Sequence, residues 1–349
     1  MELIEKTNMR AIHYLNRTTF SQFKNDCLSE AKVCGDKRPK ESDIHVWYNT
    51  LKQFCATHIK TKGITTRIYA YSQNTPAGLG GRLYGGGSIQ GVWKPYRGLL
   101  MRGITTDIDM VNAHPVILRY VCLLHNEPCP NLEYYINHRD DCLALFSNRD
   151  VGKKAFLKAT NKEKPIRDKT APMVLKEYDR EMKTIQKKLV ELPDYKPLRD
   201  TIPATRTENY NGSAINRILC YYENIILQHC IHVLNSKGIE LSALMLDGCM
   251  PYGDFYNDTN LLSEIEQYVE EQMPRLNMKF AYKPHDDTLY VPDDFDENQA
   301  SDEESYSKMK ADFEKNHCKI INSSIFVKKK PVRSLSLCLK PNSLCLTNT

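Results

Sequence analysis

The chain has 349 residues, of which 41% are hydrophobic and 26% charged, and its formal net charge at pH 7 is +5. This composition is typical of a soluble globular protein with one large or two medium domains. It excludes a membrane-spanning protein, because no run approaches about 18 apolar residues. The N-terminus lacks the apolar stretch of a signal peptide. We therefore expect an intracellular protein without a membrane partner, in either the nucleus or the cytoplasm of a host cell.

The twelve cysteines are scattered and form no Cys-x-x-Cys pair, so we expect reduced thiols and no structural zinc. The charge is unevenly distributed along the chain. Nine acidic residues and no lysine or arginine lie in the stretch 286–304, and removing them from the 43 acidic residues leaves 34 against 48 basic ones. A basic body of this kind suits a polyanionic partner such as nucleic acid.

The first 64 residues mix apolar and polar positions at helical spacing, which predicts a helical N-terminal region. One predicted apolar face contains Trp47, Leu51, Phe54 and Cys55. A segment rich in glycine and tyrosine follows at 77–91. Its glycines could form a phosphate-binding loop, but the Gly-Lys-Ser/Thr end of a P-loop is missing. A flexible turn therefore stays open as the alternative.

Two short β-rich runs end in carboxylates. Asp107 and Asp109 close the run 104–108, and Asp247 with Gly248 closes the run 241–246. Asp-Gly is also a frequent hairpin turn, so we expect a hairpin whose rigid tip presents Asp247. Mg²⁺ prefers carboxylate ligands, and two ions about 3.5–4 Å apart can stabilise both oxygens of a phosphoryl displacement. We expect Asp107 to support the strand end rather than bind metal.

Helical periodicity predicts further helices on both sides of a charged middle region. One covers 111–124, where Pro115 falls in the first turn. A longer one covers 214–234, with a broad apolar stripe that would pack on a flat surface. Glu223 and Asn224 interrupt this apolar helix, and we expect both to lie on its exposed face.

The order of these motifs resembles the palm and fingers of family A DNA polymerases. Gly81-Arg82-Leu83 is followed by Gln90, Arg97, an Asp109-x-x-Asn-x-His motif, basic helices and Asp247. The family pattern runs Gly-Arg-Leu, Leu-Gln, Arg, Asp-x-x-Gln-x-Glu, an Arg/Lys helix and His-Asp-Glu. The resemblance covers roughly residues 65 to 255. It is nearest to the divergent polymerases of large DNA viruses and mobile elements, which tend to carry a helicase domain downstream.

The resemblance implies an α/β (α+β) fold, with a polymerase-type palm built on an antiparallel sheet and a helical fingers insertion. The implied domains are a helical N-terminal region (1–64), two palm parts (65–124 and 208–292), helical fingers (125–207), an acidic linker (293–312) and the truncated start of a C-terminal domain (313–349).

The resemblance also implies a role for individual residues. Two Mg²⁺ ions would be held by Asp109 and Asp247, with the Met110 carbonyl as a further ligand. Primer-template DNA would contact Arg82, Gln90 and Arg97. The incoming deoxynucleoside triphosphate would meet Asn112, His114, Arg149, Lys153 and Lys154, of which Arg149 and Lys153 would stabilise the transferred phosphates.

The chain departs from the family pattern in the motif around Asp247 and in the fingers helix. Leu246 and Gly248 replace the histidine and glutamate that flank the second carboxylate, so only Asp247 remains there. In the fingers helix, Phe156 comes one residue early and Asn161 replaces an aromatic residue. Lys153 and Lys154 are therefore interchangeable candidates for the same role.

These features predict a template-directed DNA polymerase of viral or mobile-element replication, with a helicase in cis or in trans. Three alternatives stay open. A primase of the archaeo-eukaryotic type also uses Asp-x-Asp and a later aspartate, and often precedes a helicase. A metal-dependent glycosyltransferase would use Asp-x-Asp for a nucleotide-sugar. A non-catalytic nucleic-acid-binding module would bind DNA without needing the carboxylates.

Overall fold

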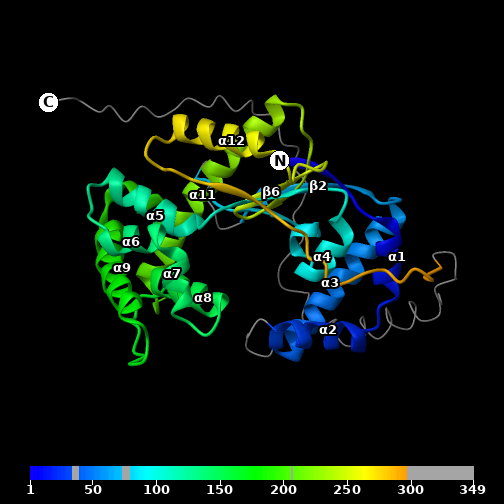
Figure 1. The fold of residues 1–349 in the computed structure, drawn as a ribbon, viewed down its shortest axis with the longest axis horizontal. Coiled ribbons are helices and arrows are strands. Elements are labelled where there is room, and N and C mark those ends of the chain that lie inside the picture. Colours follow the sequence, from blue (N-terminus) through cyan, green and yellow to red (C-terminus); the bar gives the residue numbers. More distant parts are fainter. Residues whose placement is uncertain (34–38, 73–78, 206, 297–349) are drawn as a thin grey trace. The chain divides into compact units, whose positions relative to one another are not determined.

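The structure of the protein is a computed structural model that describes residues 1–33, 39–72, 79–205 and 207–296. Residues 1–297 form one compact unit. Most of the predicted acidic linker and the whole predicted domain at 313–349 lie outside the described residues, as do positions 77 and 78 of the glycine-rich segment. Figure 1 shows the arrangement of the helices and strands.

The N-terminal region contains the predicted helices and one strand that the sequence did not predict. Its elements are β1 (Glu2–Lys6), α1 (Met9–Arg17), α2 (Phe20–Val33) and α3 (Glu41–Lys60). The fully buried carboxylate of Glu5 accepts hydrogen bonds from Arg67 Nε and from the amide of Ile89. On the predicted apolar face of α3, Leu51, Phe54 and Cys55 are buried, whereas Trp47, one turn before Leu51, is 39% exposed.

The first sheet is antiparallel and has the order β1-β2-β3. Its other strands are β2 (Ile64–Tyr71) and β3 (Leu83–Gly85), followed by the 3₁₀ helix η1 (Ile89–Gly91) and by α4 (Lys94–Met101). Much of the glycine-rich segment is thus a strand and a short helix. The turn between them is closed by Ser88, whose hydroxyl donates to the Gly85 carbonyl at 2.8 Å.

The second sheet is antiparallel and has the order β5-β6-β4-β7. Its strands are β4 (Asp107–Met110), β5 (Leu241–Met245), β6 (Gly248–Pro251) and β7 (Phe280–Lys283). The predicted strand at 104–108 was placed too early, because Gly103 has a φ of +75° and the amide of Ile104 turns back to the Met101 carbonyl. Asp107 and Asp109 therefore lie within β4 rather than after it.

The hairpin that we predicted around Asp247 is present, but its tip differs. Met245 pairs with Gly248, so the two turn residues are Leu246 and Asp247, and Gly248 is the first residue of β6. Leu246 has a φ of +24°, a value that non-glycine residues seldom adopt. The turn therefore leaves the Asp247 side chain at the end of the sheet beside β4.

Most of the helices after β4 contact α11, which is the long apolar helix predicted at 214–234. The remaining elements are α5 (Ala113–Leu124), α6 (Pro130–Asn137), α7 (Arg139–Ala144), α8 (Arg149–Asn161), α9 (Met173–Glu191), η2 (Pro193–Tyr195), α10 (Lys196–Arg199), α11 (Tyr210–Ser236) and α12 (Thr259–Gln272). α11 contacts β6, and α12 contacts both α11 and β7 (Figure 1). The α11 helix thus joins the sheet to the other helices.

The helices α6, α8 and α9, which lie between β4 and α11 in the sequence, share an aromatic core. The rings of Tyr135 and Phe156 stack at 4.0 Å, and the buried Tyr178 of α9 packs edge-on against both. The Thr160 hydroxyl hydrogen-bonds to that of Tyr178 at 2.8 Å. Among the helices of the described residues, none is long and apolar enough to cross a membrane. The predicted domain boundaries stay predictions.

Candidate active site

Three carboxylates lie on or directly beside β4 and β6, the two central strands of the second sheet. Asp107 and Asp109 come from β4, and Asp109 pairs directly with Gly248 of β6. The Met110 amide donates to the Asp247 carbonyl at 3.0 Å, which fastens the hairpin tip to the end of β4. The structure therefore brings together the two carboxylates that the sequence predicted as metal ligands. For Met110 it gives a backbone contact to Asp247, and the role of its carbonyl as a ligand stays a prediction.

The carboxylates disfavour one another's charge. Burial raises the pKa of Asp247 to about 6, and the negative charge of Asp109 contributes. Burial, again with the charge of Asp109, raises the pKa of Asp107 to about 6. Crowded like charges of this kind are relieved by a cation. All the donors are oxygen atoms, as Mg²⁺ prefers, so the residues fit a divalent ion of that type.

Basic side chains already face this cluster. Lys283 of β7 donates to Asp109 Oδ2 at 3.0 Å. Burial opposes the charge of Lys283, but Asp109, Asp107 and Asp247 together outweigh it, so the pKa of Lys283 is raised. The charges of Arg97 and Lys94 also help to lower the pKa of Asp107. Arg97, predicted to contact nucleic acid, is thus close to the carboxylates, and burial lowers its own pKa.

Replacing Lys283 by methionine is expected to increase the affinity for a divalent cation by about fivefold, because the ammonium group competes for the Asp109 carboxylate. The effect is modest since half of the Lys283 side chain is exposed and water screens the pair. Titration with Mn²⁺, followed by electron paramagnetic resonance, measures it. Lys279→Met is the matched control, as Lys279 pairs with Glu266 instead. Weaker binding by Lys283→Met would contradict competition.

The raised pKa of Asp247 predicts how the metal-free protein responds to pH. The ordinary aspartate pKa is 3.8 and that of the folded protein is about 6, so the folded state binds more protons between these values. The free energy of unfolding should therefore fall as the pH rises from about 4 to about 6, by up to about 3 kcal/mol.

Urea unfolding in EDTA across this pH range tests this expectation. Other groups also titrate there, so the quantity to follow is the stability of Asp247→Asn relative to the unmodified protein. It should increase with pH through this window, and Mg²⁺ at neutral pH should reduce it. A relative stability that is independent of pH would contradict the role assigned to Asp247.

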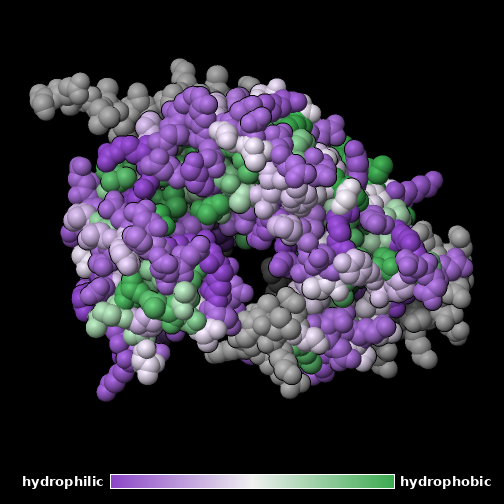
Figure 2. Space-filling model, viewed as in Figure 1, coloured by the Kyte–Doolittle hydropathy of each residue, from purple (hydrophilic) through white to green (hydrophobic). Residues whose placement is uncertain are grey.

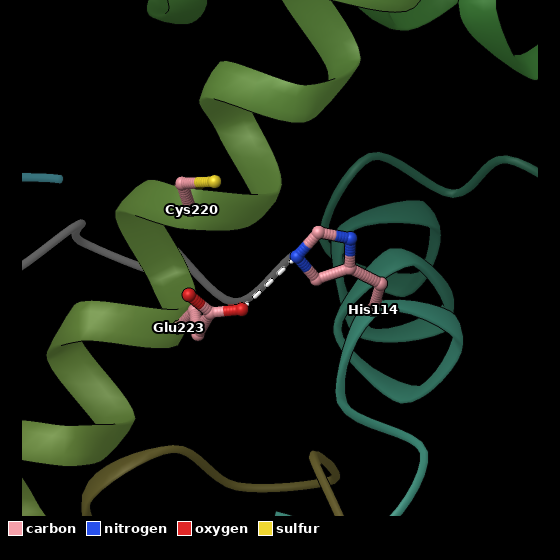
Figure 3. A group of neighbouring side chains, drawn as sticks. All are labelled: His114, Cys220 and Glu223. Carbon is pink, nitrogen blue, oxygen red and sulfur yellow. Dashed lines mark hydrogen bonds and ion pairs between the residues drawn. The ribbon is translucent and has the colours of Figure 1, made fainter. Parts of the chain in front are cut away.

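A second cluster joins β3 to the long helix. Arg82, just before β3, donates to both oxygens of Glu223 on α11, at 2.6 and 2.9 Å. His114 Nε2, at the start of α5, lies 3.0 Å from Glu223 Oε2 (Figure 3). Burial opposes the charged carboxylate, but the hydrogen bonds from Arg82 and His114 hold the pKa of Glu223 below its ordinary value. Asp247 adds to the field that raises the pKa of Arg82.

Glu223 and Asn224 are buried, so their predicted exposure was wrong. Only 1% of the Glu223 side chain is exposed, and Asn224 Nδ2 donates to the Tyr71 hydroxyl at 3.2 Å. The sequence did hold a signal for Glu223, because it lies four residues from both Leu219 and Leu227 on the buried stripe. Lys283 was missed because only the pairing of β7 with β4 brings it to Asp109.

His114, Cys220 and Glu223 are close enough for their ligand atoms to hold a metal, all within 4.8 Å of one another. In Figure 3 the two α11 residues, Cys220 and Glu223, face His114 across a short gap. However, Arg82 already supplies the positive charge on Glu223, and burial raises the pKa of the Cys220 thiol to about 11. The cluster is therefore better described as a buried ion-pair network than as a metal centre.

Gln90 lies between two strands, whereas Asn112 lies at the start of α5. The Gln90 amide accepts from the Gly85 amide and donates to the carbonyls of Leu83 and Leu244, which ties β3 to β5. Asn112 precedes α5 in the left-handed conformation, with a φ of +55°, and its side chain makes no capping hydrogen bond. Their predicted contacts with nucleic acid and nucleotide stay predictions.

The basic residues predicted to meet the triphosphate lie on α8. Arg149 pairs with Asp140 at 2.6 Å, and Lys153 pairs with Asp150 at 3.1 Å. Lys154 follows on the same helix. The charge of Lys94, from α4, helps to lower the pKa of Asp150. Figure 2 shows the surface hollowed near the centre of the view, between the part that carries α8 and the part that carries α4.

The chain has a mixed α/β fold with two antiparallel sheets, similar to that of a polymerase domain. The chain is similar to the POL domain of Pol1 from M. smegmatis, solved in complex with DNA primer-template and dNTP. The likeness has a TM-score of 0.50 at 9% identity and covers 80% of this chain and 67% of that one. The predicted fold class is confirmed by this likeness and by the two antiparallel sheets.

By sequence, the chain is similar to a viral protein. It is 26% identical, over 266 residues, to the protein named "Putative helicase V13" from Sputnik virophage. The match covers 71% of this chain but only 34% of that protein, so the chain spans about a third of that relative's length. No family model matches the chain.

Proposed function

We propose that this chain is a template-directed DNA polymerase that acts in the replication of viral or mobile-element DNA. The observation that carries the proposal is the meeting of Asp109 and Asp247 at neighbouring strands of an antiparallel sheet, within a fold of the polymerase-domain type. The reaction would be attack of a primer 3′ hydroxyl on the α-phosphate of a deoxynucleoside triphosphate, with release of pyrophosphate.

In this proposal each part of the site has a separate task. Asp109 and Asp247 would hold Mg²⁺, with two ions in the full site. When bound, the ions would supply positive charge to the attacking and leaving oxygens. Lys283 and Arg97 would limit repulsion among the carboxylates before metal binds. The basic residues of α8 would orient the triphosphate, as phosphoryl transfer depends on positioning and electrostatic stabilisation.

The network around Glu223 would position two of the residues that are predicted to contact the substrates. It fixes the Arg82 guanidinium, whose field reaches Asp247, and it holds the His114 ring at the start of α5. A buried pair of this type costs about 3–5 kcal/mol when one partner is removed, because the other charge is left without compensation. The network would therefore keep Arg82 and His114 in one arrangement during catalysis.

Extension of a labelled primer on a DNA template tests the function directly. Purified protein with Mg²⁺ and all four deoxynucleotides should lengthen the primer, and omission of one nucleotide should stop extension at the template position that requires it. That stop separates templated synthesis from terminal transfer. Failure to extend any primer, with a folded protein that binds the substrate, would overturn the proposal.

A primase attached to a helicase is the second candidate, and the likeness to the viral protein named as a helicase favours it. The two candidates differ in their need for a primer. A primase would make labelled products on a circular single-stranded template without any primer, whereas the proposed polymerase would not. If such a helicase acts with this chain, it would do so in cis or in trans.

A further inference from the structure

A basic groove lies on the inserted helices, between α9 and the loop 162–172. It has a volume of about 680 Å³, and its lining contains none of the carboxylates described above. Six basic side chains line it, against two acidic ones: Arg167, Lys169, Lys176, Arg180, Lys183 and Lys187. The groove is therefore a concentrated positive surface in a part of the protein to which the proposed chemistry assigns no role.

Four of the cations form a line along one face of α9. Lys176, Arg180, Lys183 and Lys187 follow one another at spacings of four, three and four residues, so their side chains leave the same side of the helix. Neighbouring positions on such a face are about 5–6 Å apart, and the whole line extends about 16 Å. A row of this spacing can meet successive phosphates of an extended strand.

The two acidic residues of the groove bond to other residues of its wall. Asp179 accepts from the Ile166 amide at 2.8 Å and pairs with Lys183 at 2.7 Å, which fastens the loop to α9. Asp168 accepts from the amide and the hydroxyl of Thr170 at 2.8 and 2.7 Å. Both carboxylates thus have partners within the wall of the groove.

Four of the six cations have side chains without a polar partner among the described residues. Arg167, Lys169, Arg180 and Lys187 are exposed, and none of their side chains has a hydrogen bond or ion pair with another described residue. Lys176, in contrast, donates to the Lys169 carbonyl. Arg180 also borders a smaller pocket that contains Glu177 and Glu181, which offsets part of its charge. Glu181 itself already accepts from the amides of Asn131 and Leu132.

We propose that this groove binds the sugar-phosphate backbone of one nucleic-acid strand. Its volume is in the range of pockets that enclose a single drug-sized molecule, so it admits a short stretch of one strand and not a duplex. Phosphates satisfy unpaired Arg and Lys side chains through charge-assisted hydrogen bonds. The contacts are to the backbone, and binding should therefore be independent of sequence and strongly dependent on salt.

Fluorescence anisotropy of a labelled oligothymidylate, in EDTA and at several salt concentrations, tests the proposal. The groove variant is Arg167→Gln/Arg180→Gln/Lys187→Gln. Each phosphate contact to a single strand contributes about 0.7 to the salt slope, so the variant should bind more weakly with a slope shallower by about 2. The matched control, which removes three exposed charges at the ends of α3, is Lys40→Gln/Lys60→Gln/Lys62→Gln, and it should retain the original slope.

Three outcomes would overturn the proposal: an unchanged slope in the groove variant, an equal loss in the control, or equally tight binding of labelled polyglutamate through the same three residues. The assay contains neither metal nor nucleotides. A protein that fails to extend primers can therefore still confirm the groove, and an active polymerase whose groove variant binds normally would lose only the groove.

Discussion

Replacing Asp109 or Asp247 by asparagine is expected to abolish primer extension, with a loss of more than about a hundredfold for each. Loss of a group that only orients a metal ligand commonly costs 10–100-fold, and loss of a ligand should exceed this. Asparagine has almost the same shape as aspartate, so the sheet should remain intact. The measurement is the initial rate of extension of a labelled primer at saturating Mg²⁺.

The stability of these variants distinguishes a functional role from a structural one. Asp247 carries an unfavourable charge in the metal-free protein, so Asp247→Asn should unfold at the same or a higher urea concentration at neutral pH. Asp194→Asn, which changes an exposed carboxylate on η2, should extend primers normally. Full activity of Asp109→Asn or Asp247→Asn would show that the residue is not part of the active site. A loss of activity that is explained by unfolding would likewise contradict its functional role.

The second large effect is expected at Gly248. A Cβ atom built there would lie 2.2 Å from the Ile108 carbonyl oxygen and 3.2 Å from Asp109 Cα, both of which are backbone atoms of β4. Alanine would therefore force β4 and β6 apart, and we expect Gly248→Ala to lower the free energy of unfolding by about 3 kcal/mol or more. Chemical denaturation, followed by circular dichroism, measures the change.

Gly86→Ala is the matched control, because a Cβ atom at Gly86 meets nothing within 4 Å. Its stability should stay within about 0.5 kcal/mol of the unmodified protein. In Gly248→Ala the Asp109 and Asp247 carboxylates should also separate, so the affinity for Mn²⁺ should fall along with stability. A Gly248→Ala protein as stable as the Gly86→Ala control would mean that β4 and β6 are less closely packed than the structure has them.

The close approach at Gly248 falls at a departure from the pattern that the sequence resembles. Family A polymerases have a glutamate at the corresponding place, after the second aspartate. Here the residue pairs directly with Asp109, and no side chain has room there. The second motif therefore supplies only Asp247, and the further negative charge near it comes from Asp109 on β4 and from Glu223 on α11.

The sequence was sufficient for elements that rest on local signals. The helices around Pro115 and Ile218 and the hairpin before Cys249 follow from periodicity and turn chemistry over a few residues. The two metal-binding candidates followed from a motif order. The position of β4 along the chain was harder to predict, because its start at Asp107 depends on how the turn at Gly103 closes.

The features that the sequence missed depend on pairing between distant parts of the chain. β1 is a strand because it pairs with β2 and because Glu5 finds Arg67 and the Ile89 amide, none of which is near in sequence. Glu223 is buried because Arg82 compensates its charge. Local polarity favours exposure for such residues, and only the tertiary contact reverses that expectation.

Besides Gln90, the side chain of Tyr252, which follows β6, links the two sheets. The Tyr252 hydroxyl donates to the Ile4 carbonyl at 2.6 Å and accepts from the Lys6 amide at 2.7 Å, so it closes a loop of nearly the whole described chain. Contacts of such long range slow folding. At about 5–20 residues per second, the ribosome needs roughly 10–50 s after β1 emerges to deliver this tyrosine. During synthesis the outer edge of β1 therefore lacks these two hydrogen bonds until Tyr252 has been made.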